Sequence, residues 1–210
     1  MRNLILISLF SVFFNYHLIT AESTAKKLEL SNGTYTLNTK ASTLEWIGKK
    51  VTGQHNGTIN ISQGEFVVEN DDIKTGNFEI DMSSIVDLDL NDPEWNKKLL
   101  THLKSDDFFS VEKFPTAIFE ITRIELLTSP TETANITVTG KLTIKGVTNE
   151  ISFPAFIQSI SQHLEATASI TIDRTQWSIK YGSGKFVSGL GDRLIYDDIN
   201  FNVKLVLSAK

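Results

Sequence analysis

Few residues in this sequence have the types and spacing that catalysis requires. The 210 residues include four histidines and no cysteine. Three of the histidines, His55, His102 and His163, follow the N-terminal apolar segment, and they lie far apart with no HExxH spacing among them. The sequence also has no G-x-S-x-G or phosphate-loop motif, and many of its acids stand in turn-like segments that favour Asp. It therefore predicts no catalytic residues, no metal site and no cofactor.

The segment from His102 to Phe109, HLKSDDFF, combines basic and aromatic side chains. His102 and Lys104 fall at the end of a predicted helix, where the helix dipole favours cations, so capping is the simpler explanation. The alternative is the mouth of a binding site. There the basic groups would meet a polar or anionic head, and Phe108 and Phe109 would enter an apolar cavity.

The elements that would position these residues are mostly strands. Apolar and polar residues alternate along much of the chain, and Gly, Pro, Asn and Asp separate the alternating runs. One segment breaks this pattern: Asp92, followed by Pro and Glu, begins a predicted helix over about 93–104, with Trp95, Leu99 and Leu103 on one apolar face. The predicted strands cover about 41–53, 57–69, 73–86, 115–126, 133–145, 148–159, 164–173 and 195–208.

Eight strands joined mostly by short turns, with one short helix, predict an all-β fold. Alternation alone does not separate a sandwich from a closed barrel. A barrel would remove exposed strand edges, and at about eight strands it could hold one small ligand. The composition fits one globular domain, since 40% of the residues are hydrophobic. The net charge of −5 argues against a nucleic-acid partner bound through bulk basicity.

Residues 1–21 have the pattern of a secretory signal peptide. Arg2 precedes an apolar run from Leu4 to Phe14, which is shorter than the roughly 20 residues that a membrane-spanning helix needs. We therefore expect no stable membrane insertion and a periplasmic or secreted bacterial protein. Residues 22–35 would form an N-terminal extension, and residues 36–210 would form the barrel.

Several motifs follow one another in order along the chain. They are V-x-G-x-H-x-G at 51–57, G-x-F at 64–66, HLKSDDFF at 102–109, KFPTA-x-F at 113–119, VTGKLTIKGVT at 138–148 and IDRT-x-W-x-I at 172–179. With these motifs the chain resembles the YceI-like family of polyisoprenoid-binding, lipocalin-like bacterial proteins over about residues 36–208. The motifs are specific as a set, whereas any one of them alone would be weak.

The resemblance implies an eight-stranded antiparallel lipocalin-like barrel that binds a long amphiphilic lipid in its lumen without catalysis. The lipid would be a polyprenyl phosphate, an isoprenoid quinone or a fatty-acyl derivative, and a homodimer is compatible with the family. The candidate lumen residues are bulky aromatics, namely Trp46, Phe66, Phe108, Phe109, Phe114, Phe119 and Trp177. The candidate residues at the mouth, near the head group, are His55, His102, Lys104 and Arg174.

Two other functions stay open on the residues alone. One is an envelope enzyme that acts on a lipid or glycan head group with His102 or His55 as the base. The other is a surface module that binds protein or glycan and has a filled core. Turnover that is lost in His→Ala variants would favour the enzyme, and a lumen that takes up no lipid would favour the module.

Overall fold

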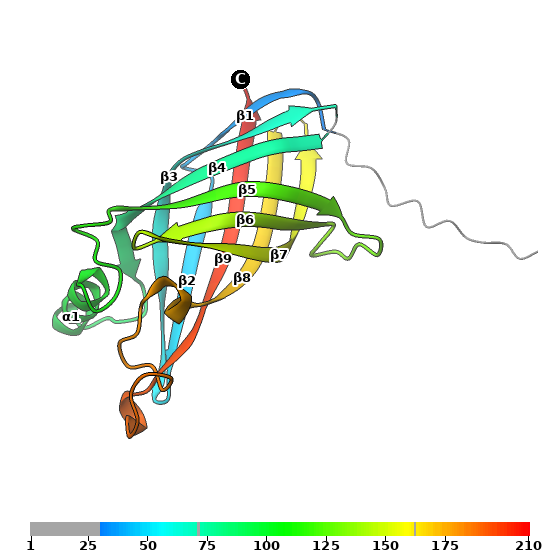
Figure 1. The fold of residues 1–210 in the computed structure, drawn as a ribbon. Coiled ribbons are helices and arrows are strands. Elements are labelled where there is room, and N and C mark those ends of the chain that lie inside the picture. The colour runs from blue at the N-terminus through cyan, green and yellow to red at the C-terminus, as the bar shows by residue number, and fades with distance from the viewer. Residues whose placement is uncertain (1–29, 71, 162) are drawn as a thin grey trace, which may run out of the picture.

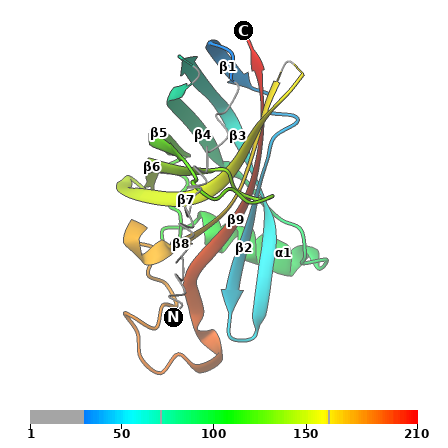
Figure 2. The same cartoon turned by 90° about the vertical axis from the view of Figure 1, so that its right-hand side faces the viewer.

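The computed structural model describes residues 30–70, 72–161 and 163–210. The expected signal peptide, residues 1–21, lies outside the described residues, and so does most of the expected extension. The described chain forms one sheet, one α-helix and two short 3-10 helices (Figures 1 and 2). The strands are β1 (Gly33–Leu37), β2 (Thr43–Lys50), β3 (Gly53–Glu69), β4 (Asp72–Asp87), β5 (Thr116–Leu126), β6 (Ile136–Ile144), β7 (Val147–Ile160), β8 (His163–Asp173) and β9 (Ile195–Ala209). The helices are α1 (Pro93–Lys104), η1 (Arg174–Trp177) and η2 (Gly191–Arg193).

The sheet closes on itself into an antiparallel barrel. Its order is β2-β9-β8-β7-β6-β5-β4-β3, and the circle is complete because β3 pairs with both β4 and β2. Trp46 in β2 lies opposite Gly57 in β3 on one side and Phe201 in β9 on the other. This closure confirms the predicted eight-stranded barrel with one short helix, and it decides between the barrel and the sandwich.

Strand β1 was not among the predicted strands. It occupies the same place in the barrel as β2, since both lie between β3 and β9, but it pairs further along them, with Gly33 opposite Val68 and Leu37 opposite Leu207. β1 begins inside the range 22–35 that the sequence analysis assigned to an extension. Its five residues are too few for alternation to be recognised against the background of the chain.

The two walls of the barrel cross steeply. In Figure 1, β5 and β6 run across the view, whereas β8 and β9 run from top to bottom. The strands that join the two walls are long, with 17 residues in β3 and 16 in β4. Their pairing shifts register at several points, between Thr58 and Asn60 and again between Ile61 and Gln63. Such bulges bend and twist a strand, which lets this pair follow both walls.

Helix α1 begins as its sequence indicates. The carboxylate of Asp92 accepts hydrogen bonds from the backbone N–H groups of Glu94 and Trp95, at 2.9 and 3.1 Å. Leu103 is buried and Leu99 packs partly against the same core, as the predicted apolar face requires. The prediction is wrong for Trp95, which is 60% exposed, and its ring lies 4.3 Å from the ammonium of Lys98. The apolar contacts of the helix with the core therefore come from its second half.

Buried side chains form two clusters, one toward each end of the barrel. The β1-end cluster contains Leu30, Tyr35, Leu37, Ile61, Phe66, Val68, Phe78, Ile136, Val138, Ala155, Ile157, Leu164, Ala166 and Leu207. The α1-end cluster contains Trp46, Ile59, Ile80, Met82, Ile85, Leu103, Phe108, Phe109, Val111, Ala117, Ile144, Ile172, Trp177 and Ile179. The chain thus has a core at either end of its lumen.

Candidate functional site

The barrel encloses an apolar cavity with a volume of about 150 Å³. Its walls come from alternate residues of the strands, as on β5, where Ala117, Phe119 and Ile121 line it. Among the described residues that line the cavity, Thr167 is the only one with a polar side chain. The other lining residues are Leu44, Ile59, Ile61, Phe66, Ile73, Phe78, Ile80, Met82, Phe109, Ile124, Ile136, Val138, Leu142, Ile144, Ile151, Phe153, Ala155, Ile157, Ala166, Ala168, Ile170, Ile172, Phe201, Val203 and Leu205. The cavity therefore suits a hydrocarbon chain.

A bulge in β5 keeps apolar residues in the wall where the alternation would otherwise fail. The register between β5 and β6 shifts between Ile121 and Arg123. After the shift Ile124, rather than Arg123, lines the cavity, and Arg123 is exposed beside Glu125. Without the bulge the inward positions of β5 would continue through Arg123, since a one-residue slip exchanges the two faces of a strand.

Two wide rings fit inside the wall because a glycine stands beside each. A Cβ at Gly140 would lie 2.5 Å from the ring of Phe119, and a Cβ at Gly64 would lie 2.3 Å from the ring of Phe78. Carbon atoms do not approach so closely, so a side chain at either glycine would push its ring from its present place. The glycines thus help to set how much of the lumen stays open.

The candidate lumen residues divide into three groups. Phe66, Phe109 and Phe119 line the cavity. Trp46, Phe108 and Trp177 belong instead to the α1-end cluster, and they do not line the cavity. Phe114 is half-buried outside the lumen, where its ring packs against Gly146.

Most of the lining is aliphatic, and no aliphatic residue was among the candidate lumen residues. Isoleucine, valine and alanine at alternate positions occur in every half-buried strand, so nothing in their type marks a cavity rather than a filled core. Only the barrel closure shows that these faces of β6, β7, β8 and β9 surround one space.

The two buried tryptophans tie the α1 end together through hydrogen bonds. The indole N–H of Trp46 donates to the backbone carbonyl of Val86 at 3.0 Å, and that of Trp177 donates to the carbonyl of Leu142 at 2.9 Å. Both indoles are almost completely buried. Because a buried N–H needs a partner, these bonds fix both rings in place, and their role is to close the barrel end.

His102 and Lys104 lie together at the α1 end, as their sequence spacing suggests. His102 Nε2 lies 3.1 Å from a carboxylate oxygen of Asp107, and its ring meets those of Phe108 and Tyr181 edge to face. The ammonium of Lys104 donates to the backbone carbonyl of Ser83 at 2.7 Å. Both side chains are half-buried, so they can reach solvent beside the core of this end.

A second lysine at this end was not singled out from the sequence. Lys145, in the turn between β6 and β7, donates to the backbone carbonyl of Asp106 at 2.7 Å. Burial lowers the pKa of Lys145, and the nearby carboxylates of Asp106 and Asp107 act in the opposite direction. It lies beside the loop that follows α1, a proximity that only the folded chain creates.

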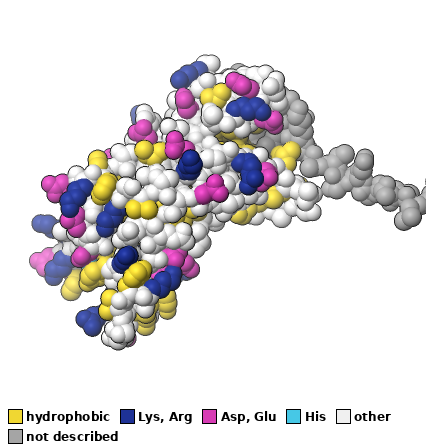
Figure 3. All heavy atoms as spheres, in the orientation of Figure 1, with side chains coloured by type: hydrophobic (Ala, Val, Ile, Leu, Met, Phe, Trp, Pro, Cys, Tyr) yellow, Lys and Arg dark blue, Asp and Glu magenta, His cyan; other side chains and the backbone are white. Residues whose placement is uncertain are grey.

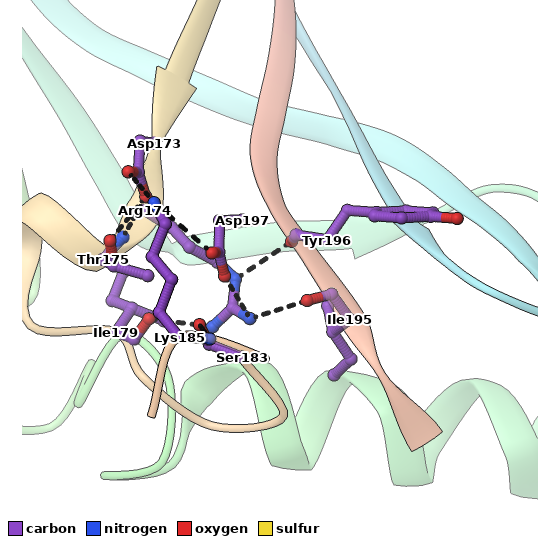
Figure 4. A network of polar contacts seen from close by, with 9 residues as sticks. All are labelled: Asp173, Arg174, Thr175, Ile179, Ser183, Lys185, Ile195, Tyr196 and Asp197. Carbon is purple, nitrogen blue, oxygen red and sulfur yellow. Dashed lines mark hydrogen bonds and ion pairs between the residues drawn. The ribbon is translucent and has the colours of Figure 1, made fainter. Parts of the chain in front are cut away.

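Arg174 is placed differently from the mouth position expected for it. Its side chain is 1% exposed and donates to the backbone carbonyls of Ile179, Ile195 and Tyr196, with Asp197 3.4 Å away (Figure 4). Burial lowers the pKa of Arg174, and the Asp197 carboxylate opposes that effect. With these partners Arg174 holds protein chain segments together, which is a structural role.

His55 also lies at the α1 end, near the start of β3. Its Nδ1 lies 3.0 Å from a carboxylate oxygen of Asp89, and the other oxygen of Asp89 accepts from the backbone N–H of Asn56 at 2.8 Å. The structure therefore gives His55 a carboxylate partner from the loop before α1.

Large hydrophobic side chains are exposed near the same end. Figure 3 shows hydrophobic side chains beside lysine and arginine side chains at the lower end of the molecule. The exposed hydrophobic residues of the loop after η1 and of the start of β9 are Tyr181, Phe186, Val187 and Tyr196, each 47–50% exposed. The ammonium of Lys180 lies 4.8 Å from the ring of Phe186. Within the described residues, no helix has the length and apolar character needed to span a membrane.

The closed eight-stranded wall, the single short helix and the apolar interior define a lipocalin-like β-barrel. The YceI-like domain model matches residues 35–207, and the chain belongs to this family. A comparison with curated proteins gave no match.

Solved structures with the same fold are distant in sequence. BcnA from Burkholderia cenocepacia is 20% identical with a TM-score of 0.61, over 81% of this chain and 98% of that one. A structure described as a polyisoprenoid binding domain from Saccharophagus degradans, implicated in plant cell wall breakdown, is 14% identical with a TM-score of 0.63, over 84% and 98%. The YceI protein of Campylobacter jejuni is 23% identical with a TM-score of 0.53, over 72% and 84%. At these identities the likeness establishes the fold.

Proposed function

We propose that this protein binds a long amphiphilic lipid in the barrel lumen, as a carrier or store, without catalysing a reaction. The lipid would be a polyprenyl phosphate, an isoprenoid quinone or a fatty-acyl derivative. The observation that carries the proposal is the cavity, whose lining is apolar apart from Thr167 among the described residues. The description of the Saccharophagus degradans structure as a polyisoprenoid binding domain supports the same ligand class.

The energetics of a hydrocarbon chain agree with such a site. Burial contributes about 0.8 kcal/mol per CH₂, so one five-carbon isoprene unit would contribute roughly 3–4 kcal/mol. Two or three buried units would contribute roughly 6–12 kcal/mol, against an association cost on the order of 4–15 kcal/mol. A cavity of about 150 Å³ accepts a group of about the size of benzene, so a longer chain would have to widen the lumen by moving side chains of its lining. The chain supplies most of the affinity, and the head group needs only modest contacts.

We place the head group at the α1 end. Phe109 lines the cavity, and it belongs to the loop directly after α1, whose last turn carries His102 and Lys104. Lys145 adds a further cation beside this loop. An anionic or polar head would thus find cationic donors at the α1 end.

We further propose that the protein works outside the cytoplasm, in the periplasm or as a secreted protein. The support is the signal-peptide pattern of residues 1–21. Exported apolar lipids are poorly soluble in water, which is a reason for a carrier with an enclosed lumen.

The test is organic extraction of the protein purified from its own host, followed by mass spectrometry of the lipid phase. A matched pair of variants places the ligand: Ala168→Phe fills the lumen, whereas Ser169→Phe adds the same ring on the exposed outer face of β8. We expect a stoichiometric prenyl, quinone or acyl species from the wild type and from Ser169→Phe, and little from Ala168→Phe.

Two results would contradict lipid binding in the lumen. No co-purified lipid, together with no uptake of a fluorescent prenyl or acyl probe by the wild type, would contradict it and favour a surface module. Equal uptake by the folded Ala168→Phe variant would show that lipid binds outside the lumen.

A further inference from the structure

Three metal-ligating side chains converge at the α1 end from separate parts of the chain. His55 comes from the start of β3, Asp87 from the end of β4, and Asp89 from the loop before α1. One ring nitrogen and one oxygen from each carboxylate lie within 4.8 Å of one another. Nothing in their sequence spacing suggests a site, because His55 lies 34 positions before Asp89.

The protein holds one oxygen of each carboxylate in place. The Oδ1 of Asp87 accepts from the backbone N–H of Leu90 at 2.9 Å and from the side-chain amide of Asn96 at 3.2 Å. The Oδ1 of Asp89 accepts from the backbone N–H of Asn56. Such bonds orient carboxylates in the way that outer partners orient metal ligands. The second oxygen of Asp89 lies 3.0 Å from Nδ1 of His55, and the second oxygen of Asp87 has no hydrogen-bond partner.

An independent observation points to a missing partner. Asp87 is only 7% exposed, and its Oδ2 is a buried side-chain oxygen with no hydrogen-bond partner, the one such atom among the described residues. An unpaired buried carboxylate oxygen is unfavourable, since it has lost its hydrogen bonds to water and gained none from the protein. A second carboxylate beside it adds repulsion. A bound cation would remove both penalties.

We propose that His55, Asp87 and Asp89 form a binding site for a divalent transition-metal ion of the Zn²⁺ type. Imidazole nitrogen and carboxylate oxygen together suit zinc, whereas a site for Ca²⁺ or Mg²⁺ would be built of oxygen alone. Ligand atoms around a tetrahedral zinc ion lie about 3.4 Å apart, given bonds of about 2.1 Å. The three atoms would reach that spacing by small side-chain rotations, with water as the fourth ligand.

Such an ion would stabilise the α1 end. It would join the start of β3 to the end of β4 and to the loop before α1, which Asn96 already ties to the helix through Asp87 and Leu90. Helix α1 carries His102 and Lys104 in its last turn. The site would therefore position the helix that precedes Phe108 and Phe109, but it does not depend on lipid binding.

The experiment is a zinc titration of the full mature chain after removal of metals with a chelator, followed by calorimetry in a buffer that does not bind zinc. We expect one zinc ion per chain and a thermal midpoint that rises with zinc concentration. His55→Gln and Asp89→Asn should each weaken zinc binding at least tenfold, and Asp87→Asn should do the same if it folds. The matched control is His163→Gln, which removes a histidine paired with a carboxylate, that of Glu165 at 3.6 Å, in β8.

Three results would overturn the proposal. One is no zinc binding by the wild type. Another is zinc binding that His55→Gln and Asp89→Asn leave unchanged, since the ion would then sit elsewhere. The third is a proton on Asp87 in place of the ion. It would be seen at neutral pH as an infrared band of a protonated carboxyl group that Asp87→Asn abolishes and that added zinc does not change.

Discussion

The guanidinium Nη1 of Arg174 lies 2.8 Å from the backbone carbonyl oxygen of Ile179, five residues later in the chain. The same side chain reaches the carbonyls of Tyr196 at 3.2 Å and Ile195 at 3.1 Å (Figure 4). One buried cation thus joins the turn after η1 to the beginning of β9. The loop between these two points carries exposed hydrophobic residues, so this junction fixes both of its ends.

Replacing Arg174 should destabilise the protein strongly. We expect Arg174→Met to lower the free energy of unfolding by about 3 kcal/mol, because several buried carbonyls lose their donors. Urea unfolding followed by fluorescence measures the change. Arg123→Met is the control, since Arg123 is exposed and forms a surface ion pair with Glu125 at 3.5 Å. This variant should change the free energy of unfolding by no more than about 0.5 kcal/mol. Equal stability of the two variants would refute a structural role for Arg174.

The contact between Trp46 and β4 predicts that Gly57 cannot be replaced. A Cβ at Gly57 would lie 1.8 Å from the carbonyl oxygen of Val86, which accepts the indole hydrogen bond, and 2.9 Å from the indole nitrogen itself. We expect Gly57→Ala to cost at least about 2 kcal/mol, since backbone must move to admit the methyl group. A weaker near-ultraviolet circular dichroism signal from Trp46 and a lower urea midpoint would show this loss of stability.

Gly48 supplies the control for Gly57. It faces the same indole, but a Cβ there would meet only the Trp46 ring, at an ordinary contact distance of 3.8 Å. Gly48→Ala should therefore leave stability nearly unchanged. A large loss in Gly48→Ala, or none in Gly57→Ala, would contradict the packing described for β2, β3 and β4.

Acid should weaken the α1 end through Asp173. Burial by itself would raise the pKa of Asp173, but hydrogen bonds from Lys185, at 2.5 Å, and from Thr175 outweigh it and hold the pKa below its ordinary value of 3.8. A carboxyl whose pKa is lower in the folded state stabilises the fold above the unfolded-state pKa. That contribution is lost as the pH falls through the folded-state value. The protein should thus lose stability below about pH 4.

The comparison of wild type with Asp173→Asn between pH 7 and pH 3 checks this expectation. Asp173→Asn should be less stable at pH 7 and should fall less steeply with acid, because it lacks the titrating group. Lys185→Met should show the same flattening, since it removes the main donor. Parallel stability curves for all three proteins would rule the interaction out.

The proposed head-group position predicts a charge-specific effect of Lys104. Lys104→Met should weaken binding of a prenyl phosphate about fivefold, or roughly 1 kcal/mol, at low salt, and should leave binding of the neutral prenyl alcohol unchanged. Fluorescence titration with both ligands measures the ratio. Lys74→Met removes an exposed lysine that pairs with Asp72 in β4, and it should change neither affinity. An equal loss for alcohol and phosphate would place the head group elsewhere.

Local patterns in the sequence were enough for the elements. Period-two alternation predicted eight of the strands, because a strand with one buried face must alternate whatever lies across from it. The helix followed from Asp92 and the proline after it, since capping and the fixed proline torsion act within a few residues. The prediction that Trp95 packs on the core was wrong, because an apolar stripe does not show how far along the helix the core extends.

Tertiary structure alone decided the lumen and the sites around it. Closure depends on β3 meeting both β4 and β2, and the bulge that turns Ile124 inward depends on how β5 pairs with β6. The burial of Arg174 likewise depends on carbonyls about twenty residues away. Alternation records which face of a strand is apolar, whereas what that face meets is set by pairing between segments distant in the chain. For that reason the sequence by itself determined the strands, the helix and a family resemblance, and the folded chain determined which residues enclose the cavity and which merely support it.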